Sequence, residues 1–100
     1  MRITLVLAAA FAALPLAASA QGQNKGRDLA ASCAICHGTE GRAVTRDVIP
    51  LAGLPKEHIA LQMMAFRDGK RSATVMHQIA KGYTDSQIEA MAAWFASQKR

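Results

Sequence analysis

Apolar side chains recur every three or four positions in three stretches of the chain. This spacing predicts amphipathic helices over residues 25–35, 55–69 and 84–100. The stretch "ATVMHQIAKGY", residues 73–83, predicts a shorter helical piece or turn between the second and third of these helices. Residues 38–54 contain three glycines and one proline without periodicity, which predicts a loop. No credible strand is present, so the chain is expected to be all-α.

The starts and stops of the two longer helices carry sequence signals. Pro55 suits the first helical position, and Gly69 is placed to end the same helix. Thr84 is a candidate N-cap for the last helix, and Gln87 three residues later completes a capping box. The last helix is therefore expected to have a clear start.

Each predicted helix has an apolar stripe that is expected to face inwards. The stripes consist of Gly26, Leu29, Ala30 and Cys33 in the first helix, Ile59, Met63 and Phe66 in the second, and Ile88, Met91, Trp94 and Phe95 in the last. A domain of this size buries only about 60% of its unfolded surface, and this one is poor in aromatic residues. A large apolar cofactor inside the domain would supply the missing bulk.

Residues 1–20 have the features of a secretory leader. Arg2 precedes an apolar run, and residues 18–20 (Ala-Ser-Ala) supply a small-residue cleavage signal. The apolar run is too short and too rich in alanine to predict a membrane span, and an uncleaved anchor is the alternative. We therefore expect a mature protein that starts at Gln21 and is exported, most simply to a bacterial periplasm, without stable membrane insertion. Residues 21–100 are expected to form one domain.

The formal net charge of +5 comes from lysines and arginines that are scattered along the chain. A nucleic-acid-binding arm would concentrate these residues in a block, so no nucleic-acid partner is expected. A mildly basic surface suits electrostatic steering towards an acidic protein partner.

The chemistry of the chain is concentrated in the stretch "SCAICHGTEG", where Cys33, Cys36 and His37 match the attachment motif of c-type haem. Two thiols three positions apart lie on one helical face, so both can add to the vinyl groups along one edge of a porphyrin. The following imidazole can then serve as the proximal iron ligand.

Three other uses of the two cysteines are less consistent with their setting. The low-pKa cysteine of a thiol oxidoreductase benefits from a helix N-terminus, whereas these cysteines follow a predicted helix with no strand before it. Structural zinc takes four ligands, yet His58 and His77 are unpaired and far apart in the sequence. A disulfide between residues three apart closes too small a loop to stabilise much.

A haem iron with His37 on one side raises the question of the sixth ligand. The candidates beyond the motif are Met63, Met64, Met76, Met91, His58 and His77. Met63 and Met91 fall on inner stripes, where core packing explains them. Met76 lies in the short segment between the two longer helices, from which a ligand can be presented without distorting a long helix. Its neighbour His77 is the main rival, because imidazole also binds iron well.

Four stretches of the chain resemble class I cytochromes c: "GRDLAASCAICHG", "IPLAGL", "AFRDGKRSATVMHQIAKGYTDSQI" and "AAWFASQK". The resemblance covers residues 21–100. It is greatest to the small periplasmic group that includes dihaem cytochromes and the cytochrome subunit of flavocytochrome c sulfide dehydrogenase. It implies three to five helices wrapped around one haem c, held through Cys33 and Cys36, with His37 and Met76 as iron ligands.

Further residue roles follow from the resemblance. Pro50 matches a proline whose carbonyl accepts the Nδ1 proton of the proximal histidine, and Gly26 matches a small residue at the crossing of the first and last helices. Gln78 departs from the family, which often has proline two positions after the axial methionine. The basic residues near the expected haem edge could pair with propionates or dock a partner; they are Arg67, Lys70, Arg71 and Lys81.

The expected function is one-electron transfer in the periplasm. No acid, base or nucleophile is evident near the motif, where Glu40 is the only carboxylate by sequence, so an electron carrier is expected rather than an enzyme. The closeness of "MHQIAKGYTDSQI" to sulfide dehydrogenase subunits favours a haem subunit that accepts electrons from a flavoprotein. The alternatives are a freely diffusing shuttle to a terminal oxidase or reductase, and a haem enzyme or sensor with an open iron position.

Overall fold

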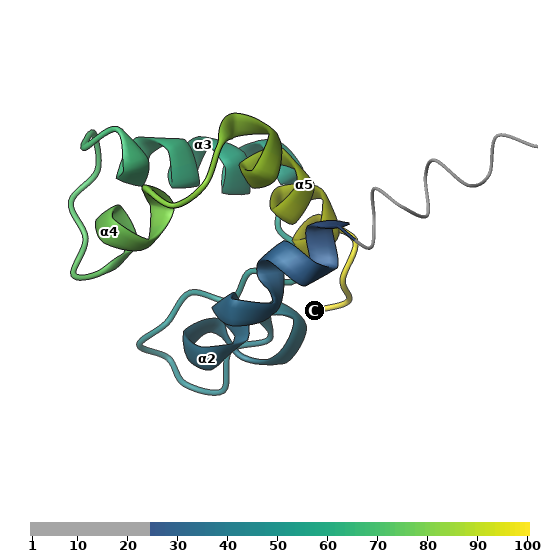
Figure 1. Ribbon diagram of the computed structural model, residues 1–100. Helices are drawn as coiled ribbons and strands as arrows, with labels where there is room; N and C mark the ends of the chain where they lie inside the picture. The colour runs from purple at the N-terminus through teal and green to yellow at the C-terminus, as the bar shows by residue number, and fades with distance from the viewer. Residues whose placement is uncertain (1–24) are drawn as a thin grey trace, which may run out of the picture.

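The computed structural model describes residues 25–100, drawn in colour in Figure 1. The predicted leader, residues 1–20, lies outside the described residues. A first helical segment covers residues 25–30. The elements that follow are the 3-10 helix η1 (Ala31–Cys33), α2 (Ala34–His37), the 3-10 helix η2 (Thr39–Gly41), α3 (Lys56–Arg67), α4 (Met76–Ala80) and α5 (Asp85–Ala96). No strand occurs between residues 25 and 100, so the all-α prediction is confirmed.

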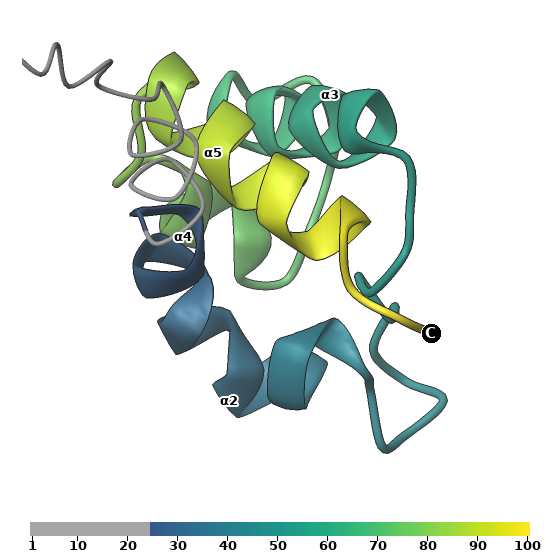
Figure 2. The ribbon, with the colours of Figure 1, turned by 90° about the vertical axis from the view of Figure 1, so that its right-hand side faces the viewer.

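The helices α3 and α5 lie side by side and form the centre of the fold (Figures 1 and 2). The buried core consists of Ala30, Ile59, Ala60, Ile88, Met91, Ala92 and Phe95. The predicted stripe of the last helix therefore faces inwards, with Trp94 half-buried at its edge. Of the helices described between residues 25 and 100, none is both long and apolar enough to cross a membrane.

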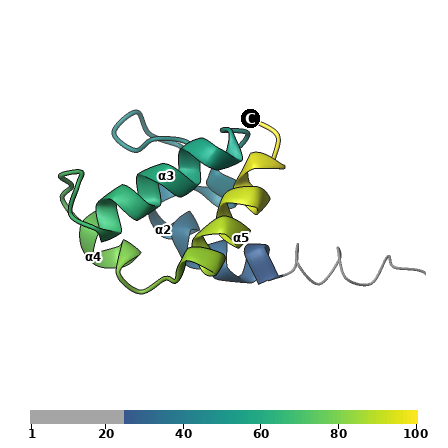
Figure 3. The same ribbon diagram turned by 90° about the horizontal axis from the view of Figure 1, so that it is seen from above.

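The first helical segment crosses α5 closely, as Figure 3 shows from above. Gly26 is the contact point: a Cβ atom there would overlap the carbonyl oxygen of Ala90 and lie 3.1 Å from the Cβ of Trp94. Glycine in a helix costs about 1 kcal/mol relative to alanine, and this crossing explains why the chain tolerates it. The role predicted for Gly26 is confirmed.

The capping box at the start of α5 is confirmed. The Gln87 backbone N–H donates to Thr84 Oγ1 at 3.3 Å, and the Thr84 backbone N–H donates to Gln87 Oε1 at 2.9 Å. The prediction for α3 is wrong by one residue, because Pro55 has an extended ψ of 135° and occupies the N-cap position ahead of Lys56.

The ribbon forms an arc in Figure 1, with α3 and α5 along its upper side. α4 lies at one end of the arc and α2 near the other, so they face each other across its open side. The cysteine motif in η1 and α2 and the Met76–His77 pair in α4 therefore lie on opposite arms of one arc.

Candidate functional site

The cysteine motif lies in helical backbone at the end of residues 25–37, which form the N-terminal arm of the arc. Cys33 ends η1, and Cys36 and His37 belong to α2. Cys33 is half-buried and packs against the core, whereas Cys36 is exposed. Both thiols are free, so they are available for attachment to a cofactor.

The environment of the motif disfavours the competing redox use of the two cysteines. Burial is the main cause that raises the pKa of the Cys33 thiol, with the nearby Cys36 adding to it. A reactive cysteine of an oxidoreductase needs the opposite shift. Between residues 25 and 100, no three His, Cys, Asp or Glu side chains gather in a way that could hold a metal ion.

The His37 side chain is held by a loop carbonyl. Its Nδ1 atom lies 2.7 Å from the carbonyl oxygen of Ile49. The acceptor predicted from the resemblance was Pro50, so that prediction is off by one residue. The ring of Pro50 restricts the residue before it to extended conformations, which fixes the direction of the Ile49 carbonyl. When Nδ1 donates its proton to a carbonyl, the other ring nitrogen, Nε2, is the one left to bind a metal.

The chain turns sharply directly after His37. Gly38 has a φ of 82°, in the left-handed region, and a Cβ there would overlap the carbonyl oxygen of Arg42. Only glycine has low strain in such a position. This turn ends α2 at the imidazole and starts the loop that returns to Ile49.

The second candidate ligand group lies at the start of α4. Met76 and His77 are the first two residues of this helix and both are half-buried, while Ala80 one turn later is fully buried. The Nδ1 atom of His77 is buried without a hydrogen-bond partner among the described residues. Two side chains of types that can bind iron, a thioether and an imidazole, therefore lie next to each other at the start of α4.

The remaining candidate ligands have other roles or positions. Met91 is part of the buried core, and Met63 and Met64 pack against it. His58 is exposed near the start of α3. Core packing therefore accounts for these methionines.

Apolar side chains are exposed next to both groups. Ile49, whose carbonyl meets His37, is 57% exposed, and Val75 and Ile79, which flank Met76, are 51% and 43% exposed. Such side chains are expected to be covered by an apolar group when the site is filled. Free thiols, an oriented imidazole, a thioether and exposed apolar neighbours fit a covalently held haem.

Two of the basic residues expected near the haem edge have protein partners. Arg67 donates to Asp85 at 2.6 Å, to Asp68 at 3.1 Å and to the carbonyl oxygen of Tyr83 at 3.4 Å. Its hydrogen bonds to the carboxylates of Asp85, the larger cause, and of Asp68 raise the pKa of Arg67. Arg71 bonds to Gln62, and its guanidinium lies 4.8 Å from the centre of the Phe66 ring.

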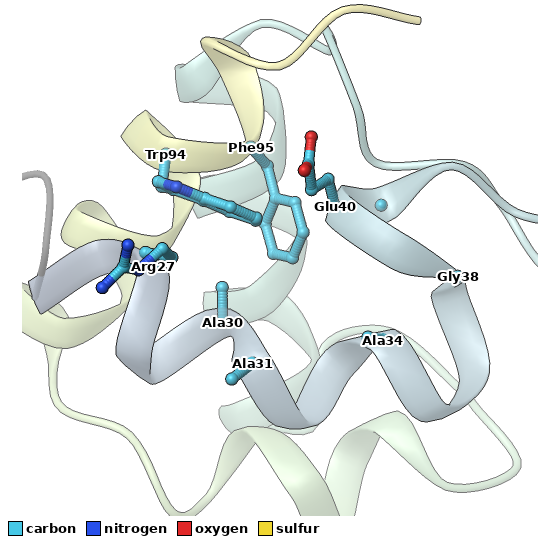
Figure 4. A pocket seen from close by; sticks show the side chains of 9 residues that line it. Arg27, Ala30, Ala31, Ala34, Gly38, Glu40, Trp94 and Phe95 are labelled. Carbon is cyan, nitrogen blue, oxygen red and sulfur yellow. The ribbon is translucent and has the colours of Figure 1, made fainter.

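A hollow of about 190 Å³ lies between residues 27–41 and the end of α5 that carries Trp94 and Phe95 (Figure 4). Its floor is apolar: the rings of Trp94 and Phe95 meet edge to face at 5.1 Å, opposite Ala30. Glu40 is half-buried at its rim and pairs with Arg42 at 3.0 Å. None of the predicted site residues lines this hollow.

The chain is similar to known cytochromes over most of its length. It is 40% identical over 76 residues to the cytochrome subunit of sulfide dehydrogenase from Chlorobaculum tepidum, covering 75% of this chain and 67% of the relative. It is 32% identical over 77 residues to cytochrome c-554(548) of Halomonas halodenitrificans, covering 74% of this chain and 93% of the relative. No protein-family model matches the chain.

A solved structure shares the fold. The cytochrome c4 structure from Acidithiobacillus ferrooxidans matches with a TM-score of 0.72 and 30% identity, covering 76% of this chain. The match covers only 49% of the solved chain, so this chain spans about half of that protein. The helical fold and these relatives place the chain in the class I cytochrome c family. Its relatives are haem proteins of electron transport, and the chain's function is electron transfer of that kind.

Proposed function

We propose that the chain is a single-haem electron carrier, with haem c attached to Cys33 and Cys36 and its iron between His37 and Met76. The observation that carries the proposal is the 2.7 Å contact from His37 Nδ1 to the Ile49 carbonyl oxygen. That contact presents Nε2 for a metal. When bound, haem supplies an iron centre that takes up and gives back one electron.

The two cysteines and the proximal histidine act as one unit in this proposal. The helical backbone from η1 into α2 brings both thiols to one side of the chain. Covalent attachment there does not depend on the strength of the iron ligands. Gly38 then lets the chain turn away directly after His37.

Met76 is the proposed sixth ligand in the resting protein. A thioether favours the reduced ion relative to a second imidazole, so Met76 raises the reduction potential. Met63 and Met91 have core positions that account for them without any bond to iron. His77, the alternative, stays open to the test described below.

The setting of the carrier is also proposed. Residues 1–20 serve as a cleaved leader and residues 21–100 as the cytochrome domain, which works in the periplasm. The charged side chains near the site are exposed or paired, and we propose a carrier without its own catalytic group rather than an enzyme or sensor with open iron.

The donor is proposed to be a flavoprotein that oxidises sulfide. The support is a relative that is a cytochrome subunit of sulfide dehydrogenase. A freely diffusing shuttle is the second candidate. Purification from periplasm at low salt distinguishes the two hypotheses. A subunit should copurify with a yellow, flavin-containing chain, whereas a free shuttle should elute alone.

Mass spectrometry and one ligand variant test the haem assignment. The mature protein should have the mass of residues 21–100 plus one haem and should stain for haem after denaturing electrophoresis. Replacing Met76 by Leu should abolish the weak red absorption band of iron–thioether bonding, while Met63→Leu, the matched control, should keep it. A colourless protein of bare-chain mass would refute the proposal. Loss of the band in the Met63 variant would show that Met63, and not Met76, is the sixth ligand.

A further inference from the structure

We propose that His77 is a reserve iron ligand: when the Met76 sulfur leaves the iron, the His77 imidazole takes its place. This inference rests on the proposed function, because it assumes that Met76 is the resting ligand. It adds a metal-binding role to a side chain that otherwise has no assigned partner.

The His77 ring is available for a metal. Its Nδ1 atom is buried, and no other buried side-chain nitrogen or oxygen of the half-buried and buried residues described lacks a hydrogen-bond partner. Buried polar atoms are normally paired, so an unpaired one suggests an occupant that the protein alone does not provide. A neutral imidazole is a common ligand for iron and needs no other bond to be broken here.

Because Met76 and His77 are neighbours on α4, exchanging one for the other as ligand needs only a small rotation of the helix. Successive residues on a helix are rotated by about 100° around its axis. Seen along the axis, the residue four positions after the first of two neighbours therefore projects between them. Ala80 occupies that intermediate position and is 0% exposed, whereas Gln78 and Ile79 face outwards. Met76 and His77 thus lie on either side of the buried face of α4. A rotation of the start of α4 by about 100° would bring His77 to the position of Met76.

The first turn of α4 is weakly held. The N-cap residue Val75 provides no side-chain hydrogen bond. The first backbone bonds come from Gln78 and Ile79, both to the Val75 carbonyl oxygen, at 3.0 and 3.1 Å. Met76 and His77 precede these donors, so their own N–H groups donate no helical hydrogen bond that a turn would break.

The exchange needs no other reactant. The iron–sulfur bond to Met76 breaks, a bond from an imidazole nitrogen of His77 forms, and the iron keeps its oxidation state. His77 then closes the position that Met76 left, and small ligands are kept out. The reduction potential falls, because imidazole does not favour the reduced ion as a thioether does.

The test uses the exported holoprotein with haem attached. Met76→Ala should lose the thioether band but stay low-spin by electron paramagnetic resonance, with a lower potential than wild type. The double variant Met76→Ala/His77→Ala should become high-spin and bind added imidazole at least about tenfold more tightly, because nothing competes for the iron. The matched control Met76→Ala/His58→Ala removes an exposed histidine of α3 and should behave like Met76→Ala.

A high-spin Met76→Ala that binds imidazole as tightly as the double variant would overturn the reserve-ligand proposal and leave the carrier function intact. Loss of the low-spin state in the His58 control would overturn it as well. If Met76→Ala fails to mature, Met76→Leu, which keeps the side-chain bulk, gives the same comparison. Failure of the proposed function would look different: wild type would lack the thioether band, or His77→Ala alone would change its coordination.

Discussion

One short hydrogen bond, 2.7 Å from Nδ1 to the carbonyl oxygen, joins the His37 ring to the backbone of Ile49, twelve positions later in the sequence. Proline at position 50 limits the backbone angles of Ile49 and so keeps this carbonyl aimed at the ring. The electronic character of His37, the proposed proximal ligand, therefore depends on a peptide group that no side-chain replacement can remove directly.

Loosening that peptide group should change the reduction potential. Pro50→Ala frees the backbone of Ile49, weakens its bond to His37 and makes the imidazole a poorer donor to iron. A poorer donor stabilises the oxidised state less, so the potential should rise. The folded state should also lose about 0.4–1 kcal/mol, because the unfolded chain gains freedom. Redox titration and urea unfolding measure the two effects.

Pro55→Ala is the matched control for Pro50, since Pro55 is the N-cap of α3 and does not precede the carbonyl that meets His37. It should leave the potential unchanged. Equal potentials for wild type and Pro50→Ala would show that the Ile49 carbonyl does not tune the site.

A side chain at Gly26 should weaken the crossing of the first helical segment over α5. The added methyl group of Gly26→Ala would meet the Ala90 backbone carbonyl, which cannot rotate away. Overpacking of this kind costs about 1–3 kcal/mol, partly offset by the better helix propensity of alanine. Chemical unfolding of the holoprotein should show a net loss.

Gly82→Ala provides the comparison, because its Cβ would lie 3.5 Å from the Ile79 carbonyl oxygen, an ordinary contact. Its stability should be unchanged or slightly raised. A Gly26 variant as stable as the Gly82 variant would mean that the two helices separate easily.

Removing the cap of α5 should lower stability without affecting the iron. Thr84→Ala deletes the oxygen that accepts from the Gln87 backbone N–H and should cost about 0.5–2 kcal/mol. Thr45→Ala, in the exposed loop, should have almost no effect. Thermal unfolding of both variants measures this difference, and a changed absorption spectrum in Thr84→Ala would contradict the separation of cap and site.

Arg67 should act as a structural clamp and not as a haem-edge charge. Its guanidinium joins the end of α3 to Tyr83 and Asp85 at the start of α5, and its side chain is only 22% exposed. Arg67→Gln should lower the melting temperature and leave the reduction potential unchanged. Arg46→Gln, at an exposed loop position, should change neither. A shifted potential in Arg67→Gln would restore the propionate role expected from sequence.

The pH dependence of that clamp follows from the direction of its pKa. Because Asp85 and Asp68 raise the pKa of Arg67, its contribution is present below the unfolded-state pKa and is lost only when pH rises through the higher folded-state pKa. The difference in stability between wild type and Arg67→Gln should therefore stay constant through neutral and mildly alkaline pH. Unfolding midpoints across that range test it.

The sequence predicted the parts of the fold that depend on local pattern. The stripe of α5, the Thr84–Gln87 capping box and the small residue at position 26 follow from spacing, capping chemistry and family resemblance, and the structure agrees with all three. Helix ends were less certain: Pro55 fits either of two adjacent positions, and only its backbone angle decides between them.

The parts that sequence did not predict depend on contacts between distant segments. The hydrogen-bond acceptor for His37 is a backbone carbonyl, which every residue has. The sequence alone therefore cannot distinguish Ile49 from Pro50 as the acceptor. Arg67 has several carboxylates within reach along the chain, and only the fold selects Asp85. The burial of His77 Nδ1 depends on how α4 packs against α3, which periodicity over five residues cannot specify.

The contact of Gly26 with Ala90 and Trp94 joins the beginning of the domain to its end. A chain that emerges from its N-terminus cannot complete this contact until the last helix has been delivered. Closure of the two ends therefore belongs to the slower, non-local part of folding, whereas the capping box of α5 forms between neighbouring residues.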